Sequence, residues 1–181
     1  MNLDVRELPF ENEQFSSIFS TAAFEHVNEL DKALAEMYRV IKPGGYVYAD
    51  FGPIWSCSVG HHVCAEADGE EAHHWQPGKN PVPHYAHLLF SRDDLKSKLL
   101  NDKVSQNLSD AIIEWIYEKK EINRLLFEDY TELFNNSPFE IIQLNTIQEH
   151  IEKDILRVLS QKHTGYKEFG VRSVEVLLKK I

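Results

Sequence analysis

Residues 4–20 read DVRELPFENEQFSSIFS, residues 24–27 read FEHV, and residues 38–51 read YRVIKPGGYVYADF. Phe15 to Ser20 places an aromatic and a β-branched residue between turn-forming residues and is too short for a helix, so it predicts a buried strand. Tyr46 to Phe51 is rich in aromatic and β-branched residues and predicts a second strand. The residues between these strands have a helical pattern. A strand, a helix and a strand in succession indicate an α/β fold.

The helix between the two strands has a start, a buried face and an end. Asn28 can cap its N-terminus, and the segment 42–45 (KPGG) ends it, because proline excludes continuation and glycine can adopt positive φ. Apolar residues recur at helical spacing between these ends at Leu30, Ala33, Leu34, Met37, Tyr38 and Ile41. We therefore expect an amphipathic helix.

The rest of the chain has a different pattern. From Gly52 to Phe90 no period is maintained, so we expect a loop-rich segment, and a long loop of this kind is usually functional. Helices are predicted from Ser91 through Leu99, from Ser109 to Leu125 or Leu126, and from Ile151 to Leu159. Strands are predicted at Phe139 to Leu144 and at Val174 to Leu178.

Length and charge bound the kind of protein. The 181 residues, 43% of them hydrophobic, suffice for one compact domain with a core. A net charge of -10 disfavours nonspecific binding to nucleic acid or to an anionic membrane. No apolar run reaches the ~18 residues that span a bilayer, and the charged N-terminus does not fit a secretory signal. With Cys57 and Cys64 as its two cysteines, the sequence favours a cytoplasmic protein.

Residues 4–55 resemble the central portion of class I S-adenosylmethionine-dependent methyltransferases of the type 11 group. Members of this group read D-x-x-x-L-P-F, then F-D-x-I-x-S, then E-H, then a helix that ends R-V-L-K-P-G-G. This chain has the pieces in that order, with Phe15-Ser16 in place of F-D. Residues 168–180 (EFGVRSVEVLLKK) resemble the family's last strand. The resemblance implies a partial Rossmann-like methyltransferase sheet, made of the last parallel strands plus an antiparallel C-terminal strand, with flanking helices.

The resemblance also implies which residues bind S-adenosylmethionine. Asp4 matches the acidic position whose carboxylate accepts a hydrogen bond from the adenine amino group, and the N–H of Val5 would meet a ring nitrogen. Ser20 and Thr21 end the first strand, where ligands of open α/β sheets gather, and would line the methionine portion. The alternatives are a solvated turn for Asp4 and ordinary strand-end capping for Ser20 and Thr21.

His26 is the candidate catalytic residue beside this pocket. A neutral imidazole there can take a proton from the acceptor as the methyl group is transferred. The alternative is that His26 only fixes a loop through a hydrogen bond, because methyl transfer from a sulfonium often needs little beyond alignment of the reactants.

The segment 52–90 contains six of the nine histidines. It leaves the second strand at its carboxyl end, so we expect a lid over the acceptor site. The residues expected to contact the acceptor are Trp55, His61, His62, His84, Tyr85 and His87. The alternative is a lid without a chemical role. The spacing of Cys57 and Cys64 disfavours a zinc site, so we expect no metal.

The sequence contains no Gly-x-Gly turn, which members of the family have near their first strand. We therefore expect residues 1–181 to be a single partial domain, the C-terminal portion of a methyltransferase on a truncated chain. Its first strand would have one free edge, through which the protein could self-associate. The expected function is methyl transfer to a small-molecule or glycan-type acceptor, with no nucleic-acid or membrane partner. The alternative is a non-catalytic remnant that acts as an interaction module.

Overall fold

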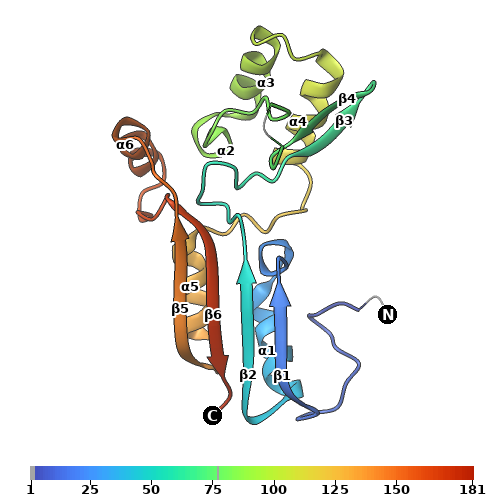
Figure 1. The fold of residues 1–181 in the computed structure, drawn as a ribbon, viewed down its shortest axis with the longest axis vertical. Helices are drawn as coiled ribbons and strands as arrows, with labels where there is room; N and C mark the ends of the chain where they lie inside the picture. The colour runs from blue at the N-terminus through green and yellow to red at the C-terminus, as the bar shows by residue number, and fades with distance from the viewer. Residues whose placement is uncertain (1–2, 77) are drawn as a thin grey trace.

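The computed structural model describes residues 3–76 and 78–181. Its main sheet has the strand order β1-β2-β6-β5 (Figure 1). β1 (Phe15–Thr21) is parallel to β2 (Ile41–Phe51), whereas β6 (Val171–Lys179) is antiparallel to both β2 and β5 (Glu140–Gln148). The predicted fold class, an α/β sheet of parallel strands with an antiparallel C-terminal strand and flanking helices, is confirmed.

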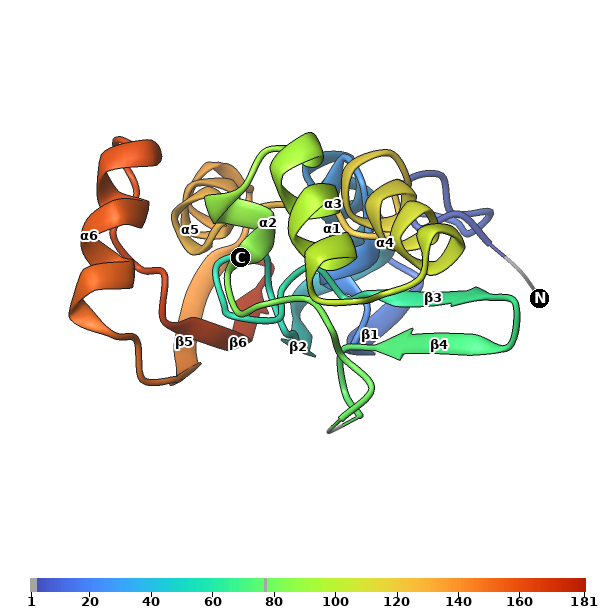
Figure 2. The same ribbon diagram turned by 90° about the horizontal axis from the view of Figure 1, so that it is seen from above.

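The main core lies on one face of this sheet. The helices α1 (Leu30–Val40) and α5 (Phe127–Asn136) lie on the same side of the strands (Figures 1 and 2). Strand side chains alternate between the two faces, so every second residue points toward these helices. The core includes Leu30, Leu34, Met37, Val47, Ala49, Tyr130, Phe134, Val174, Val176 and Leu178.

The strand β1 is the outer strand of the sheet among the described residues. This agrees with the expectation that one of its edges is free. On the face away from α1, the side chain of Phe19 is 72% exposed and its ring stacks on Tyr48 at a centroid distance of 5.2 Å. Tyr46 is exposed as well. The sheet thus presents a free edge beside an aromatic surface.

The start of α1 differs from the prediction. Glu29, in the left-handed conformation at φ 56°, precedes the helix, and no side chain caps it. The side chain of Asn28 instead donates from Nδ2 to the Lys120 carbonyl at 3.1 Å. The predicted Asn28 cap is therefore wrong, because a partner far along the chain occupies the amide.

The strand β2 begins earlier than predicted, at Ile41, and includes the segment 43–45 (PGG). Ile41 pairs with Phe15, but the register then shifts before Ser17 pairs with Tyr46. Proline and glycine are tolerated here because the ladder is interrupted at this point.

The segment after β2 is more regular than the expected loop. β3 (Cys64–Ala67) and β4 (Glu70–His73) form an antiparallel hairpin, and α2 (Ala86–Leu89) is a single turn. These strands were not predicted because four residues are too few to show a period. We call residues 52–118 the cap; Figure 1 shows it beyond the carboxyl ends of β1 and β2. Its own core comprises Val63, Ala65, Ala72, Leu95, Leu99, Ile112, Ile113 and Ile116, among others.

The remaining helices follow the sequence pattern in part. Ser91 caps α3 (Arg92–Asn101) as predicted, accepting the Asp94 N–H at 3.2 Å. α4 (Gln106–Tyr117) is capped by Ser105, before the predicted start at Ser109, and it ends before Leu125. The helix α5 was not predicted, whereas α6 (Lys153–Lys162) lies close to its predicted place. Among the described helices, none combines the length and apolar content that crossing a bilayer requires.

Candidate functional site

A recess at the carboxyl end of β1 brings together residues that are far apart in the sequence. Its volume is about 360 Å³, within the ~300–1,000 Å³ typical of small-molecule sites. The lining residues are Leu3, Asp4, Val5, Arg6, Ser20, Ala23, Phe24, His26, Val27, Asn28 and Met37. We call this the N-terminal recess. Of the predicted cofactor and catalytic residues, Asp4, Val5, Ser20 and His26 line it, whereas Thr21 is exposed and is not among the lining residues.

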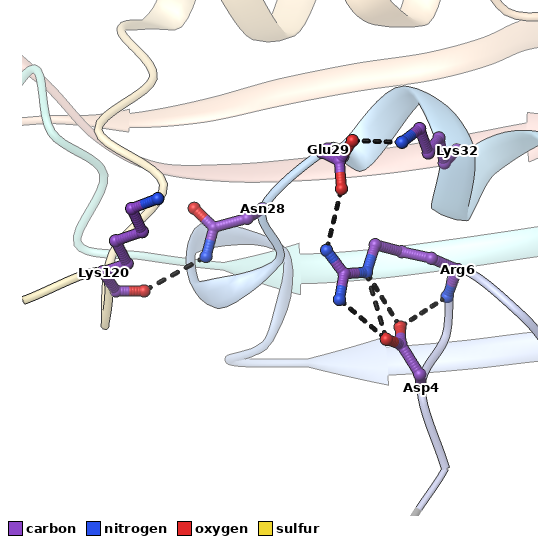
Figure 3. A network of polar contacts seen from close by, with 6 residues as sticks. All are labelled: Asp4, Arg6, Asn28, Glu29, Lys32 and Lys120. Carbon is purple, nitrogen blue, oxygen red and sulfur yellow. Dashed lines mark hydrogen bonds and ion pairs between the residues drawn. The ribbon is translucent and has the colours of Figure 1, made fainter.

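The carboxylate of Asp4 is fixed at the rim of this recess by Arg6 (Figure 3). Asp4 Oδ1 accepts from the backbone N–H of Arg6 at 2.9 Å, and Oδ2 accepts from Arg6 Nη2 at 2.7 Å. These hydrogen bonds lower the pKa of Asp4 to about 2. Asp4 is therefore an oriented anion throughout the neutral range. The backbone N–H of Val5, next to it, has no hydrogen-bond partner among the described residues.

His26 lies at the end of a short 3-10 turn, η1 (Phe24–His26). Its Nδ1 is 2.6 Å from the carbonyl oxygen of Glu121. A carbonyl only accepts, so Nδ1 carries the proton and Nε2 carries the free lone pair. The ring of His62 stands edge-on to it at 5.3 Å. This tautomer leaves Nε2 available as a base and also fixes the ring, so both expected roles of His26 fit the contact.

Glu25, the residue before His26 in the sequence, is buried. Its Oε1 accepts the Gly52 N–H at 3.1 Å, and its Oε2 has no partner among the described residues. Burial raises the pKa of Glu25. Gly52, at φ 144°, could not carry a side chain there, because a Cβ would lie 2.7 Å from the Arg172 carbonyl oxygen. Glu25 therefore fixes the point at which the chain leaves β2 for the cap.

Residues 119–124, which lie in the connection between α4 and α5, hold the turn η1 in place through hydrogen bonds. Asn123 Nδ2 donates to the Phe24 carbonyl at 2.7 Å and to the Val27 carbonyl at 3.2 Å. Its backbone N–H donates to the Glu25 carbonyl at 2.9 Å, and its Oδ1 accepts from Tyr130 at 2.9 Å. No local motif in the sequence predicts these contacts, because the partners lie about a hundred residues apart.

The predicted acceptor residues lie within the cap, where Trp55, His61 and His87 form one group of ring contacts and His62 belongs to another. His87 meets Trp55 at 4.5 Å and His61 at 5.4 Å, and His62 stacks on His74 at 4.7 Å. Burial lowers the pKa of His62 to about 3 and that of His87 to about 4, and it lowers the pKa of His61 well below the ordinary value. These three histidines are therefore neutral at pH 7. Among the described residues, no cluster of His, Cys, Asp or Glu is arranged to hold a metal ion.

His84 and Tyr85 belong to neither group of ring contacts. His84 is exposed and lines a separate recess with His74 and Trp75. Tyr85 is buried, and its hydroxyl donates to Glu149 Oε1 at 2.9 Å. Glu149 also accepts from the backbone N–H and the hydroxyl of Ser58, at 2.6 and 3.1 Å. Tyr85 thus fastens the cap to the end of β5.

Comparison with known proteins identifies the part of the chain that carries this recess. Residues 1–49 match the model of the methyltransferase domain family. Over 42 residues the chain is 48% identical to the ubiquinone/menaquinone biosynthesis C-methyltransferase UbiE of Psychromonas ingrahamii, covering 23% of this chain and 17% of that protein. Over 55 residues it is 38% identical to the demethylmenaquinone methyltransferase of Streptomyces avermitilis, covering 29% of this chain and 24% of that protein.

The matches to these two curated relatives therefore span less than a quarter of their lengths. Among solved structures, an S-adenosylmethionine-dependent methyltransferase from Mesorhizobium loti aligns with a TM-score of 0.49 at 10% identity, covering 98% of this chain and 67% of that one. Residues 1–49, which match the model of the methyltransferase domain family, include the recess residues Asp4, Val5, Ser20 and His26.

Proposed function

We propose that the protein transfers a methyl group from S-adenosylmethionine to a small-molecule or glycan-type acceptor. One observation carries the proposal. Asp4, Val5, Ser20 and His26, which come from separate parts of the family motif, line one recess at the carboxyl end of a parallel strand. Ligands of open α/β sheets bind at this edge.

The lining of the recess fits the adenine and methionine portions of the cofactor. The Asp4 carboxylate accepts hydrogen bonds and the neighbouring Val5 N–H donates one, which matches the donor and acceptor edge of adenine. Ser20 would line the methionine portion, and we retain Thr21, one residue further on, as a candidate there. When bound, S-adenosylmethionine supplies an electrophilic methyl group on a sulfonium. Among the described residues, those that line the recess include no glycine.

His26 is the candidate general base. Its Nε2 has a free lone pair because Nδ1 donates to Glu121. A base of this kind would take the proton that an acceptor hydroxyl or amine loses on methylation. The fixed ring orientation supports this role, since a base must be held within hydrogen-bond reach of the proton.

Residues 52–90 of the cap are the candidate acceptor lid. They follow β2 directly, and the ring of His62 contacts the ring of His26, whereas Trp55, His61 and His87 form a separate group of ring contacts. Trp55, the half-buried ring of this group, is the strongest candidate for stacking against an acceptor. His84 and Tyr85 stay candidates through the position of the cap, although neither lines the N-terminal recess.

Calorimetric titration with S-adenosylhomocysteine tests this function. Saturable micromolar binding supports a working site. Absence of binding heat at millimolar S-adenosylhomocysteine would exclude methyl transfer as the function of this chain.

An interaction module that self-associates through β1 is the second candidate. The observation that favours it is the free edge of β1 beside the exposed ring of Phe19. Exposed edges pair readily with a second copy of the same strand. Sedimentation velocity over a range of concentrations tests it, with Phe19→Lys as the variant. A monomer at all concentrations would exclude this candidate.

A further inference from the structure

A second recess adjoins the N-terminal recess and has a different charge. Its volume is about 500 Å³. Its polar lining residues are Arg6, Asn28, Glu29, Lys120, Asn123 and Arg124, and we call it the basic recess. Arg6 and Asn28 line both recesses, so the two share a wall. A ligand in one recess would therefore lie next to a ligand in the other.

Arg6, the cation of the shared wall, is already neutralised. Arg6 pairs with Asp4 at 2.7 Å and with Glu29 at 2.9 Å, and Glu29 also pairs with Lys32 (Figure 3). These four residues carry two positive and two negative charges. Arg6 and Glu29 therefore leave no net charge to attract a ligand into the basic recess.

Lys120 and Arg124 are different, because neither forms an ion pair with any described residue. They place two uncompensated positive charges on one recess of a chain whose net charge is -10. Such a local reversal of sign concentrates anionic ligands at the recess.

The backbone and side-chain contacts of these two residues hold them at the recess. The Lys120 carbonyl accepts from Asn28 Nδ2 at 3.1 Å, which fixes the base of a side chain whose ammonium stays free. The guanidinium of Arg124 lies over the ring of Trp55 at 5.6 Å. Its Nη2 donates to the Lys119 carbonyl at 2.9 Å. A guanidinium has five N–H donors, so four have no acceptor among the described residues.

We propose that the basic recess binds a phosphate or carboxylate group of the methyl acceptor, through the ammonium of Lys120 and the free N–H donors of Arg124. The acceptor's anionic end would lie in the basic recess and its reacting end would extend across Arg6 and Asn28 toward His26. Guanidinium and ammonium groups are the usual partners of both anions. The overall acidity of the chain makes a nucleic-acid phosphate an unsuitable ligand. That the anion belongs to the acceptor rests on the proposed function; the binding of the anion does not.

Titration of the full chain with two probes tests the inference, inorganic pyrophosphate for phosphates and succinate for carboxylates. We expect saturable binding of at least one probe, and the stronger one names the anion class. Lys120→Ala with Arg124→Ala should weaken it at least about tenfold. Lys42→Ala with Arg157→Ala removes the same charge at exposed sites elsewhere and should change it less than about twofold. Lys120→Glu, at an exposed position, is the variant to use if the double variant fails to fold, and it should abolish binding.

Two results would overturn the inference. One is that neither probe binds. The other is that the two double variants weaken binding equally, which would mean that only overall charge matters. Binding of pyrophosphate without binding of S-adenosylhomocysteine would support the basic recess as an anion site and contradict the proposed function. Binding of S-adenosylhomocysteine without binding of either anion would support the proposed function and contradict this inference.

Discussion

Arg6 binds Asp4 in a two-pronged hydrogen-bonded pair, with Nε 3.0 Å from Oδ1 and Nη2 2.7 Å from Oδ2. Such pairs fix orientation as well as charge. The backbone N–H of Arg6 donates to Oδ1 as well, and Nε also lies 3.2 Å from Oδ2. Arg6 therefore holds the Asp4 carboxylate in one orientation at the N-terminal recess.

The pKa of Asp4 tests this pairing. NMR titration of the side-chain carboxyl carbon should give a value near 2 in the native chain. Arg6→Gln should return the pKa toward the ordinary value near 3.8, because the bonds that stabilise the anion are lost. Lys32→Gln removes a positive charge that pairs with Glu29 rather than with Asp4, so it should leave the pKa of Asp4 unchanged. A normal pKa in the native chain would contradict the pairing.

His26→Asn separates the two roles of the histidine. The asparagine amide can still donate to the Glu121 carbonyl, but it has no basic nitrogen. If Nε2 is the general base, turnover in the proposed methyl transfer should fall by roughly 10²–10⁴-fold while cofactor affinity is retained. His150→Asn, at an exposed position, is the control and should keep full activity. Full activity of His26→Asn would leave only the positioning role.

The cap should depend for its attachment on Glu149. Glu149→Ala leaves the N–H and hydroxyl of Ser58 and the hydroxyl of Tyr85 without their acceptor, so we expect the free energy of unfolding to fall by about 3 kcal/mol. Tyr85→Phe should lower it by about 1 kcal/mol. Tyr46→Phe, at an exposed ring, should change it by less than about 0.5 kcal/mol. Urea unfolding measures all three, and equal stability of Glu149→Ala and the native chain would refute the attachment.

Acid should destabilise the fold through the buried histidines. His62 and His87 have folded pKa values of about 3 and 4, whereas an unfolded histidine titrates near 6.5. Below pH 6.5 the unfolded chain takes up protons that the folded chain does not, so stability falls as pH falls toward the folded pKa values. At pH 5 the loss is about 2 kcal/mol for each such histidine.

His87→Phe tests this coupling without relying on absolute stability. The variant should lose about 2 kcal/mol less than the native chain between pH 7.5 and pH 5, because one titrating group is gone. His150→Phe should keep the native pH dependence. Parallel curves for His87→Phe and the native chain would show that His87 is not the source.

Local patterns in the sequence were sufficient to predict a helix or strand where residues within that element determine its ends and its buried face. The spacing of Leu30, Ala33, Leu34 and Met37 predicted the buried face of α1, and Ser91 predicted the start of α3. Four of the residues that the family motifs suggest for cofactor binding and catalysis line the N-terminal recess, and their roles stay predictions. In each case the relevant signal lies within a few residues or in a motif of fixed order.

Long-range contacts account for what the sequence did not predict. Asn28 has the chemistry of a helix cap, but its amide binds Lys120 instead. In the sequence, nothing distinguishes Lys120 and Arg124 from other surface charges; the fold brings them into one recess with Arg6. Tyr85 and His61 are residue types that often bind ligands, yet both are buried here, and the hydroxyl of Tyr85 donates to Glu149. None of these partners follows from periodicity.

The most direct test of the central claim is calorimetric titration of S-adenosylhomocysteine into the native chain and into Asp4→Asn. The account predicts micromolar binding to the native chain and at least about tenfold weaker binding to Asp4→Asn, because a neutral amide is a poorer acceptor than an oriented carboxylate. Asp31→Asn, which changes an exposed carboxylate on α1, should bind like the native chain. Absence of binding at millimolar ligand, or equal binding by Asp4→Asn, would contradict the assignment of the N-terminal recess as the cofactor site.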